Sequence, residues 1–398
     1  MNIKSKIRIK TFILFKLLLL ISVIFITACS TVKVINVNYV EEFKKHSIIY
    51  SLPKTIIDVK VKTTKTTYKK GPYYNYAKKY LGIDNAIIND KTEWNINDID
   101  ISDSFLPDTA NYYLLYSNNN SIARKINLTD NGIIKSFNLR NNDKDCKNKT
   151  SYYKNNNNDN IDFYDLTIKK HFEEIIDTTY KVIQTDSSVR KIPVYSTRLS
   201  EKGLEKKAEE AADFIIKLRK RRLRILTGKD DIIPNGEAAK SIIDELNLIE
   251  KRYLELFTGV ERSEKIKYHF KYEPKSERAK PEVLFKFSTI NGIDNIKCKS
   301  CTPYYISVKP YNYTTVIDSM FSKAKKPVKQ HKGIIYRIPE NSIVEIYENR
   351  EIIADKNVLI NQFGVLNLIP ASIFKSNDIE IDFFDKNGAL KSISSNLK

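Results

Sequence analysis

Cysteine is the residue type whose spacing in this chain best indicates a specific chemistry. Cys29 closes the tetrad Ile26-Thr27-Ala28-Cys29, in which small residues stand directly before the cysteine. The tetrad resembles a bacterial lipobox, where a signal peptidase cuts before a cysteine whose thiol already carries diacylglycerol. A diacylated cysteine supplies the hydrophobic tails that stable membrane anchoring needs. The sequence therefore predicts that Cys29 is lipidated and becomes the N-terminus of the mature protein.

The segment before Cys29 has the order of a secretory signal. Basic residues without any acidic residue come first, and the apolar run from Leu17 to Ile26 follows. This run is shorter than the roughly 20 apolar residues of a transmembrane helix. We therefore expect residues 1–28 to be a signal peptide. The alternative is an uncleaved anchor that starts near Phe12, and under either interpretation the rest of the chain is exported.

The remaining cysteines are Cys146, Cys298 and Cys301. The C-x-x-C spacing of the last two allows a local disulfide, a redox pair or half of a zinc site. A thioredoxin-type pair needs a helix that begins at the first cysteine, but here strand-like runs flank the pair and Pro303 follows. A zinc site would need two more ligands. We expect a disulfide between Cys298 and Cys301 or two idle thiols, and we expect no metal and no cofactor.

A basic run, KLRKRRLR, is the other concentration of chemistry-bearing side chains. It ends a predicted helix that begins with acidic residues, and this charge order matches the helix macrodipole. The functional alternative is a patch for an anionic partner, because arginine forks bind phosphate and carboxylate. The residues of this predicted patch are Lys217, Arg219, Lys220, Arg221 and Arg224. Arg222 interrupts the apolar stripe of the helix, so we expect it to pair with Glu245 or Glu250 on a facing helix.

No catalytic constellation is apparent. Ser51 and Lys54 match the S-x-x-K spacing of penicillin-recognising enzymes, but Pro53 and the alternation that follows place them on a strand, and no K-T-G partner exists. The four histidines lie far apart in sequence: His46, His171, His269 and His331. Four tyrosine doublets should each place one ring in the core and one outside. A carboxylate pair for hydrolysis would leave no spacing signature.

Composition narrows the class of partner. The chain has a net charge of +19, and the predicted signal peptide accounts for five of its basic residues. Export removes the usual reason to infer nucleic-acid binding from a basic chain, so we expect no nucleic acid. Anionic polymers of the cell envelope remain candidates through non-specific attraction.

Periodicity predicts an α+β fold in which two β-rich parts flank an antiparallel helical hairpin. Residues 29–45 carry no clear pattern and are interpreted as a tether. Residues 46–200 form the first β-rich domain, since Ile57, Val59 and Val61 alternate with polar residues. Within it we expect a short helix at 73–81, ended by Gly82, and an Asn-rich loop at 141–160.

Two helices with apolar seams follow in the segment 201–260, with Gly228 and Gly259 at their C-terminal ends. Residues 261–398 return to strand signals and form the second β-rich domain. The two β-rich parts share one short repeated motif, IIYSLP at 48 and IIYRIP at 334, which we call the echo segments. In this repeat Tyr50 and Pro53 correspond to Tyr336 and Pro339.

An ordered set of motifs carries a family resemblance. The segments YSLPKTIIDVKV, GPYYNYAKKYLGI, ADFIIKLRKRRLRILTG, YRIP and QFGVLNLIP resemble the uncharacterised lipoproteins of the Bacteroidota grouped as domain of unknown function 4831. The resemblance covers most of residues 46–370. It implies an envelope protein without an assigned activity, so no catalytic residue is carried over. The segment CSTVKVINV lacks the acidic cluster of surface-exported lipoproteins, and this favours the periplasmic leaflet of the outer membrane.

Three functions agree with these observations. The first is a non-catalytic subunit or scaffold of an envelope complex, held in the lipid bilayer through Cys29 and bound to an outer-membrane protein. The second is a lipoprotein that binds an envelope polysaccharide or another anionic polymer. The third is a hydrolase with an unrecognised carboxylate pair.

Overall fold

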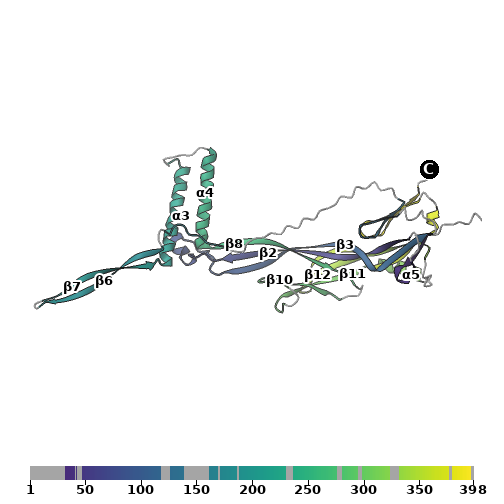
Figure 1. Ribbon diagram of the computed structural model, residues 1–398, viewed down its shortest axis with the longest axis horizontal. Coiled ribbons are helices and arrows are strands. Elements are labelled where there is room, and N and C mark those ends of the chain that lie inside the picture. The colour runs from purple at the N-terminus through teal and green to yellow at the C-terminus, as the bar shows by residue number, and fades with distance from the viewer. Residues whose placement is uncertain are drawn as a thin grey trace, which may run out of the picture.

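The computed structural model describes residues 32–40, 42, 47–117, 126–138, 161–168, 171–185, 188–229, 236–275, 280–294, 298–322, 331–375 and 379–395. Cys29, Cys146 and the Asn-rich segment 141–160 lie outside these ranges. The chain is mostly β-strand with few helices. Figure 1 shows an elongated molecule, in which long strands form the body, two helices stand off it, and a thin ribbon projects from one end.

The longest sheet is built around β2 (Ser47–Lys69), which pairs antiparallel with its neighbours. Its strand order is β1-β3-β2-β8, with β1 (Val32–Asn36), β3 (Lys91–Ser117) and β8 (Val260–Tyr272). The predicted alternation on β2 is confirmed, since Ile57, Val59 and Val61 are fully buried. At about 3.3 Å per residue, β2 alone extends for roughly 75 Å.

A second sheet packs against the buried face of the first. Its order is β10-β9-β11-β12-β13, with β10 (Gly292–Asp294), β9 (Glu282–Ser288), β11 (Thr302–Pro310), β12 (Gly333–Glu348) and β13 (Glu351–Pro370). The shared core between the two sheets includes Ile57, Val59, Phe285, Ile306, Val344 and Ile360. This face-to-face packing explains why both sheets carry alternating apolar residues.

A third, smaller sheet closes the end of the body near β1. Its order is β15-β14-β5-β4, with β15 (Leu390–Ser395), β14 (Ile379–Phe383), β5 (Ile134–Phe137) and β4 (Ile126–Leu128). Tyr50, Ile334 and Phe383 meet in the core beneath it. Short 3-10 turns, η2 (Val37–Tyr39) and η4 (Ile373–Lys375), lie near this end.

Two sequence-based boundaries need correction. The β-rich parts 46–200 and 261–398 are not separate domains, because β8 joins the first sheet and β14 pairs with β5. Nor is the whole of 29–45 a tether. Val32 and Val34 lie in the core and β1 pairs with β3, because these valines gain more from burial in the sheet edge than from exposure in a free linker.

The helices other than the one at 313–322 gather at the opposite end of β2 (Figure 1). The predicted helix 73–81 consists of η3 (Tyr74–Tyr76) and α2 (Ala77–Leu81), capped by Gly82 in the left-handed conformation. The long helices are α3 (Leu204–Leu226) and α4 (Gly236–Thr258), and α5 (Tyr313–Ser322) lies against β12 and β13. None of the helices in the described residues is long and apolar enough to cross a membrane.

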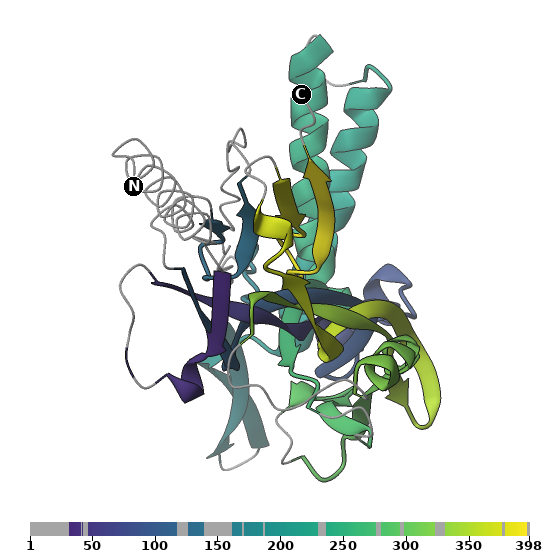
Figure 2. The ribbon, with the colours of Figure 1, turned by 90° about the vertical axis from the view of Figure 1, so that its right-hand side faces the viewer.

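A third core holds α3 and α4 to the end of the body. It includes Tyr73, Ala77, Ala211, Ile215, Leu256 and Phe257. Gly71 sits where β2 ends against α4, and a Cβ atom there would lie 2.2 Å from the backbone oxygen of Leu256. Only glycine allows this close approach. Figure 2, viewed from the end of the long axis, shows the helix pair standing off one side of the body.

A two-stranded ribbon extends from the base of α3. It consists of β6 (Phe172–Thr185) and β7 (Ser188–Glu201), which pair with each other and with no other described strand. In Figure 1 the ribbon projects to the left, away from the end that carries the C-terminus. Its base is held by ion pairs from Lys206 to Glu173 and from Lys207 to Glu201.

The two echo segments of the sequence occupy equivalent places in two long hairpins. The β2–β3 pairing shifts register between Ser51 and Pro53, and the β12–β13 pairing shifts between Ile338 and Glu340, around Pro339. In each hairpin a third strand, β8 or β11, begins to pair only three or four residues after the proline. Proline lacks an N–H donor, so a bulge at a locally unpaired edge is where a strand tolerates it.

The echo segments also contact each other directly. The Tyr50 hydroxyl donates to the backbone oxygen of Ile335 at 3.0 Å and accepts from the Ile335 N–H at 3.1 Å. Tyr50 is fully buried, and burial raises the pKa of its hydroxyl well above the usual range. One neutral hydroxyl thus satisfies both backbone groups of a residue 285 positions away.

We predict that Tyr50→Phe destabilises the protein by about 1–3 kcal/mol, because it leaves a buried N–H and a buried C=O without their partner. Urea unfolding followed by circular dichroism measures the change. Tyr112→Phe is the matched control, since Tyr112 lies on the neighbouring strand and is partly exposed, and we expect a change within about 0.5 kcal/mol. Equal losses for the two variants would contradict the assigned role.

Candidate functional site

The basic run of α3 divides into two sets on opposite sides of the helix. At 3.6 residues per turn, Lys217, Lys220, Arg221 and Arg224 have the spacing of a single helix face. All four are exposed, and we call them the outer stripe. The face that packs inward carries the buried residues Ile215, Leu218 and Ile225.

Arg219 and Arg222 point instead toward α4, where both bind Glu250. Arg219 Nε donates to Glu250 Oε1 at 2.6 Å, and Arg222 Nη1 donates to Glu250 Oε2. Arg222 Nη1 also donates to Asn247 Oδ1 at 2.6 Å. We call this arrangement the Glu250 clamp. The predicted pairing of Arg222 with a carboxylate on the facing helix is confirmed, and Glu250 rather than the exposed Glu245 is the partner.

The clamp fixes how the helices face each other. Phe214 packs on Tyr253 with ring centroids 4.7 Å apart, and Arg222 reaches Asn247, so the two helices run in opposite directions. Burial raises the pKa of the Glu250 carboxyl, but the hydrogen bonds and charges of Arg219 and Arg222 outweigh burial and leave the pKa lowered. Arg219 is therefore a partner of the clamp, unlike the other four residues of the predicted patch.

The outer stripe combines charge with apolar surface. Its four cations extend over about 10 Å of helix, and like charges at this spacing repel one another. Beside them on the helix surface lie Ile216 and Leu223, which are 37% and 61% exposed. An anionic group would relieve the repulsion, and the apolar pair adds surface that a protein partner covers better than a small anion does.

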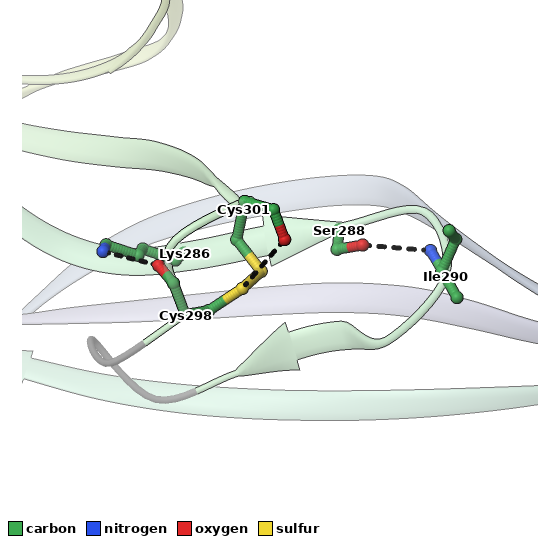
Figure 3. Close-up of a disulfide and its surroundings, with 6 residues drawn as sticks. Lys286, Ser288, Ile290, Cys298 and Cys301 are labelled. Atoms are coloured by element: carbon green, nitrogen blue, oxygen red, sulfur yellow. Dashed lines mark hydrogen bonds between the residues drawn. A yellow bond between two sulfur atoms is a disulfide. The ribbon is translucent and has the colours of Figure 1, made fainter.

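A disulfide joins Cys298 and Cys301 in the turn before β11 (Figure 3). Lys286 Nζ donates to the Cys298 backbone oxygen at 2.8 Å, which ties this turn to β9. No helix begins at Cys298, since the pair lies between β10 and β11. The disulfide therefore crosslinks the two ends of a short turn. No group of three or more His, Cys, Asp or Glu side chains within the described residues could hold a metal ion.

The S-x-x-K residues do not come together. The Ser51 hydroxyl is buried and donates to the backbone oxygens of Leu52 and Asp108, at 2.9 and 3.2 Å. Lys54 Nζ forms an ion pair with Glu273 at 3.0 Å. On a strand, residues three positions apart point to opposite faces. Neither side chain therefore activates the other.

The histidines remain apart where they are described. His269 Nε2 lies 3.1 Å from Asp58 Oδ1 on adjacent strands, and His331 bonds to Val34 through backbone atoms only. His171 is exposed near the ribbon base, and His46 is outside the described residues.

The described tyrosine doublets follow the predicted division. Tyr73, Tyr113 and Tyr304 are buried, whereas Tyr74, Tyr112 and Tyr305 are partly exposed. The doublet Tyr152-Tyr153 lies outside the described residues. The prediction is therefore confirmed for the three doublets that can be compared.

The sequence interpretation missed a buried ion pair between Arg337 and Asp108. Both Arg337 Nη atoms lie 3.2 Å from Asp108 Oδ2, and Nη1 also donates to the Pro53 backbone oxygen. Arg337 is 5% exposed and Asp108 is 9% exposed. The one signal in the sequence was the echo, in which Arg337 stands at the position of Ser51 in the other segment.

A small hollow, with room for about one water molecule, opens beside the echo contact. No carboxylate lines it, and its walls come from Tyr50, Ser51, Leu52, Pro53, Ile133, Ile134, Ile335, Tyr336, Phe383 and Gly388. Hydrolysis by a pair of carboxylates requires two acids that face one cavity, and this hollow does not provide them.

Glu250→Gln tests the clamp. We predict that it lowers the free energy of unfolding by roughly 1–3 kcal/mol at neutral pH, because two charged hydrogen bonds lose their acceptor charge. The lowered pKa of Glu250 means that its contribution is complete above the unfolded pKa of about 4.3 and is lost as the pH falls through the folded pKa. The difference between wild type and Glu250→Gln should therefore shrink below about pH 4. Glu245→Gln, at an exposed site on the same helix, is the control and should show no such loss.

Comparison with known proteins gives a family but no activity. No curated protein and no solved structure matches this chain. A family model described as Domain of unknown function (DUF4831) matches residues 46–391. This span contains the echo segments, the disulfide, the ribbon and the α3–α4 pair. The chain therefore belongs to the family of domain of unknown function 4831.

Proposed function

We propose that this protein is a non-catalytic subunit or scaffold of a bacterial cell-envelope complex, anchored by lipid at Cys29. The observation that carries the proposal is the helix pair α3–α4, which stands off the body and presents the outer stripe beside Ile216 and Leu223. A surface that combines cations with exposed apolar side chains suits a folded protein partner with an acidic, partly apolar face.

The position of β1 supports anchoring close to the body. Val32 is buried at the start of β1, only three residues after Cys29. Three extended residues reach about 10 Å. A lipid on Cys29 would therefore hold the β1 end of the body directly against the bilayer, with no long tether between them.

The direction of β2 then determines how far the partner surface lies from the membrane. The Ser47 end of β2 is near β1, and its Lys69 end meets β8 and the helix pair. These ends are roughly 75 Å apart along the strand. A body of this length would carry the helix pair away from the membrane surface when it stands upright, as a spacer does. We propose that the protein is anchored in the periplasmic leaflet of the outer membrane.

A second candidate function is the binding of an anionic envelope polymer. The outer stripe favours it, because four cations on one helix face attract polyanions and the attraction is screened by salt. The apolar pair Ile216 and Leu223 favours the first proposal instead. A polymer that binds through charge alone should lose affinity in high salt, whereas a protein partner held partly by apolar contact should persist.

Purification from the native membrane in mild detergent, followed by mass spectrometry, tests the partner. We expect a protein recovered in stoichiometric yield, and we expect Lys220→Glu with Arg221→Glu to lower its yield at least tenfold. The control is Lys265→Glu with Lys267→Glu, which makes the same charge change at exposed positions of β8. Recovery of the chain alone from wild-type membranes, together with salt-sensitive binding to envelope polysaccharide, would favour the second candidate.

The lipid anchor has its own test. Cells labelled with radioactive palmitate should yield a labelled wild-type protein and an unlabelled Cys29→Ser variant, because the thiol of Cys29 is the acceptor of the diacylglycerol. Cys146→Ser serves as the control and should keep the label. Label that persists on Cys29→Ser would overturn the anchoring proposal.

A further inference from the structure

The β6–β7 ribbon exposes an apolar face that a soluble surface does not normally show. On β6, Phe172, Ile176, Tyr180 and Val182 are each more than half exposed. On β7, Val189, Tyr195 and Leu199 are 61–71% exposed. Large apolar side chains at this density mark an interaction surface rather than scattered exposure.

These seven side chains lie on the same side of the ribbon. Alternate residues of a strand share a face, and directly opposed residues of two antiparallel strands share it as well. In the register of the ribbon, Phe172 faces Glu201, Glu174 faces Leu199, and Val182 faces Lys191. The pairing from Thr178 to Tyr195 lies at the middle of this face. We call this side the apolar face.

The opposite side of the ribbon is more polar. Arg198 and Asp177 form an ion pair there at 2.9 Å, and Arg190 and Lys181 belong to the same side by register. Its exposed apolar residues, Ile183, Ile192 and Val194, are 43–46% exposed. The ribbon is thus amphipathic, and its apolar face exposes more apolar surface than the opposite side does.

We propose that the apolar face binds the apolar face of a second copy of this chain, with the two ribbons antiparallel. Charge placement carries the choice of occupant. On the apolar face, Glu174 lies toward the base of the ribbon and Lys191 lies toward its tip. Consider a two-fold axis that lies between the two packed faces, crosses the strands at right angles and passes the pair of Thr178 and Tyr195. This axis places Lys191 of each copy beside Glu174 of the other, whereas a parallel arrangement of the two ribbons does not.

The same axis matches the apolar side chains. Leu199 meets the region of Val182, Ile176 meets that of Tyr180, and Phe172 meets that of Val189. A self-complementary patch of this kind is what an isologous dimer requires. The alternative of insertion into a bilayer is disfavoured, because the outer edges of a two-stranded ribbon would leave backbone N–H and C=O groups unpaired in hydrocarbon.

The expected dimer is weak and reversible. A 14-residue strand extends for about 46 Å, and two strands cover a face about 10 Å wide. Two copies would bury roughly 1,000 Å² in total, which is the lower end of specific interfaces. Figure 1 shows that the ribbon twists, so the second copy would coil around it. An isolated two-stranded ribbon is marginally stable, and a second copy would make four strands of it.

Thiol crosslinking of the full chain in its native membrane tests the proposal. Two faces that pack on each other lie about 10 Å apart, too far for a direct disulfide. In a Cys146→Ser background, Tyr195→Cys faces its counterpart across the two-fold axis and should give a crosslinked species of twice the chain mass with a short bismaleimide. Ser196→Cys, the next residue on the opposite side, is the control and should give at least fivefold less. A crosslinked species of any other mass, or equal yields at the two positions, would overturn the pairing of two copies.

Charge exchange then tests the antiparallel arrangement. Added to Tyr195→Cys, Glu174→Lys should lower the dimer yield about two- to fivefold, as expected for an exposed ion pair, and Lys191→Glu on top of it should restore the yield. Leu199→Asp should lower it more than tenfold, and Val194→Asp on the opposite side should not. These side chains are exposed, so folding is not at risk, and circular dichroism verifies it. Failure of the second charge change to restore the yield would overturn the antiparallel register.

Discussion

The structure depends on one constraint, which is that the two long hairpins must satisfy their backbone polar groups where a proline interrupts each of them. Pro53 and Pro339 break the register of β2–β3 and β12–β13 at equivalent places. The interrupted strands lie in the core, where an unpaired N–H or C=O is costly. The Tyr50 hydroxyl pairs with both backbone groups of Ile335, which lies just before the interruption of β12 on an edge that β11 does not reach. Arg337 donates to the Pro53 carbonyl. These contacts hold the two hairpins together beside their interruptions.

The long core between the two large sheets begins beside this junction. Once β2 and β12 are fixed at one end, their alternating apolar residues must face each other along their length, and the core between the two large sheets results. Just beyond the other end of β2 lies Gly71, where the chain approaches α4 closely beside the third core. A body built on one strand of roughly 75 Å separates its two ends. This separation would keep the proposed anchor at one end apart from the proposed partner surface at the other.

The basic run on α3 divides into residues that contact α4 and residues that are exposed. Charge along the helix is arranged to suit the macrodipole, and this alone explains acidic residues first and basic residues last. The facing carboxylate of Glu250 then takes two of the arginines, because a buried carboxylate needs donors and positive charge. The four remaining cations, Lys217, Lys220, Arg221 and Arg224, are exposed at the surface. The structural interpretation of the run therefore applies to Arg219 and Arg222, and the proposed partner surface uses the other four residues.

The sequence by itself determined the elements whose periodicity is local. The alternation at Ile57, Val59 and Val61, the helix ended by Gly82, and the seams of α3 and α4 were all predicted, because side-chain burial at a fixed period is recorded in neighbouring residues. Arg222 predicted a carboxylate partner for the same reason, because it interrupts the apolar stripe of its helix. Only the tertiary structure decided that β8 and β14 join sheets begun by β2 and β5, since strand pairing over 200 residues leaves no local pattern. It also decided that Val32 and Val34 belong to the core, that Arg337 meets Asp108, and that the apolar residues of the ribbon face water. Each of these depends on which surfaces meet in space, and a period along the chain carries no information about that.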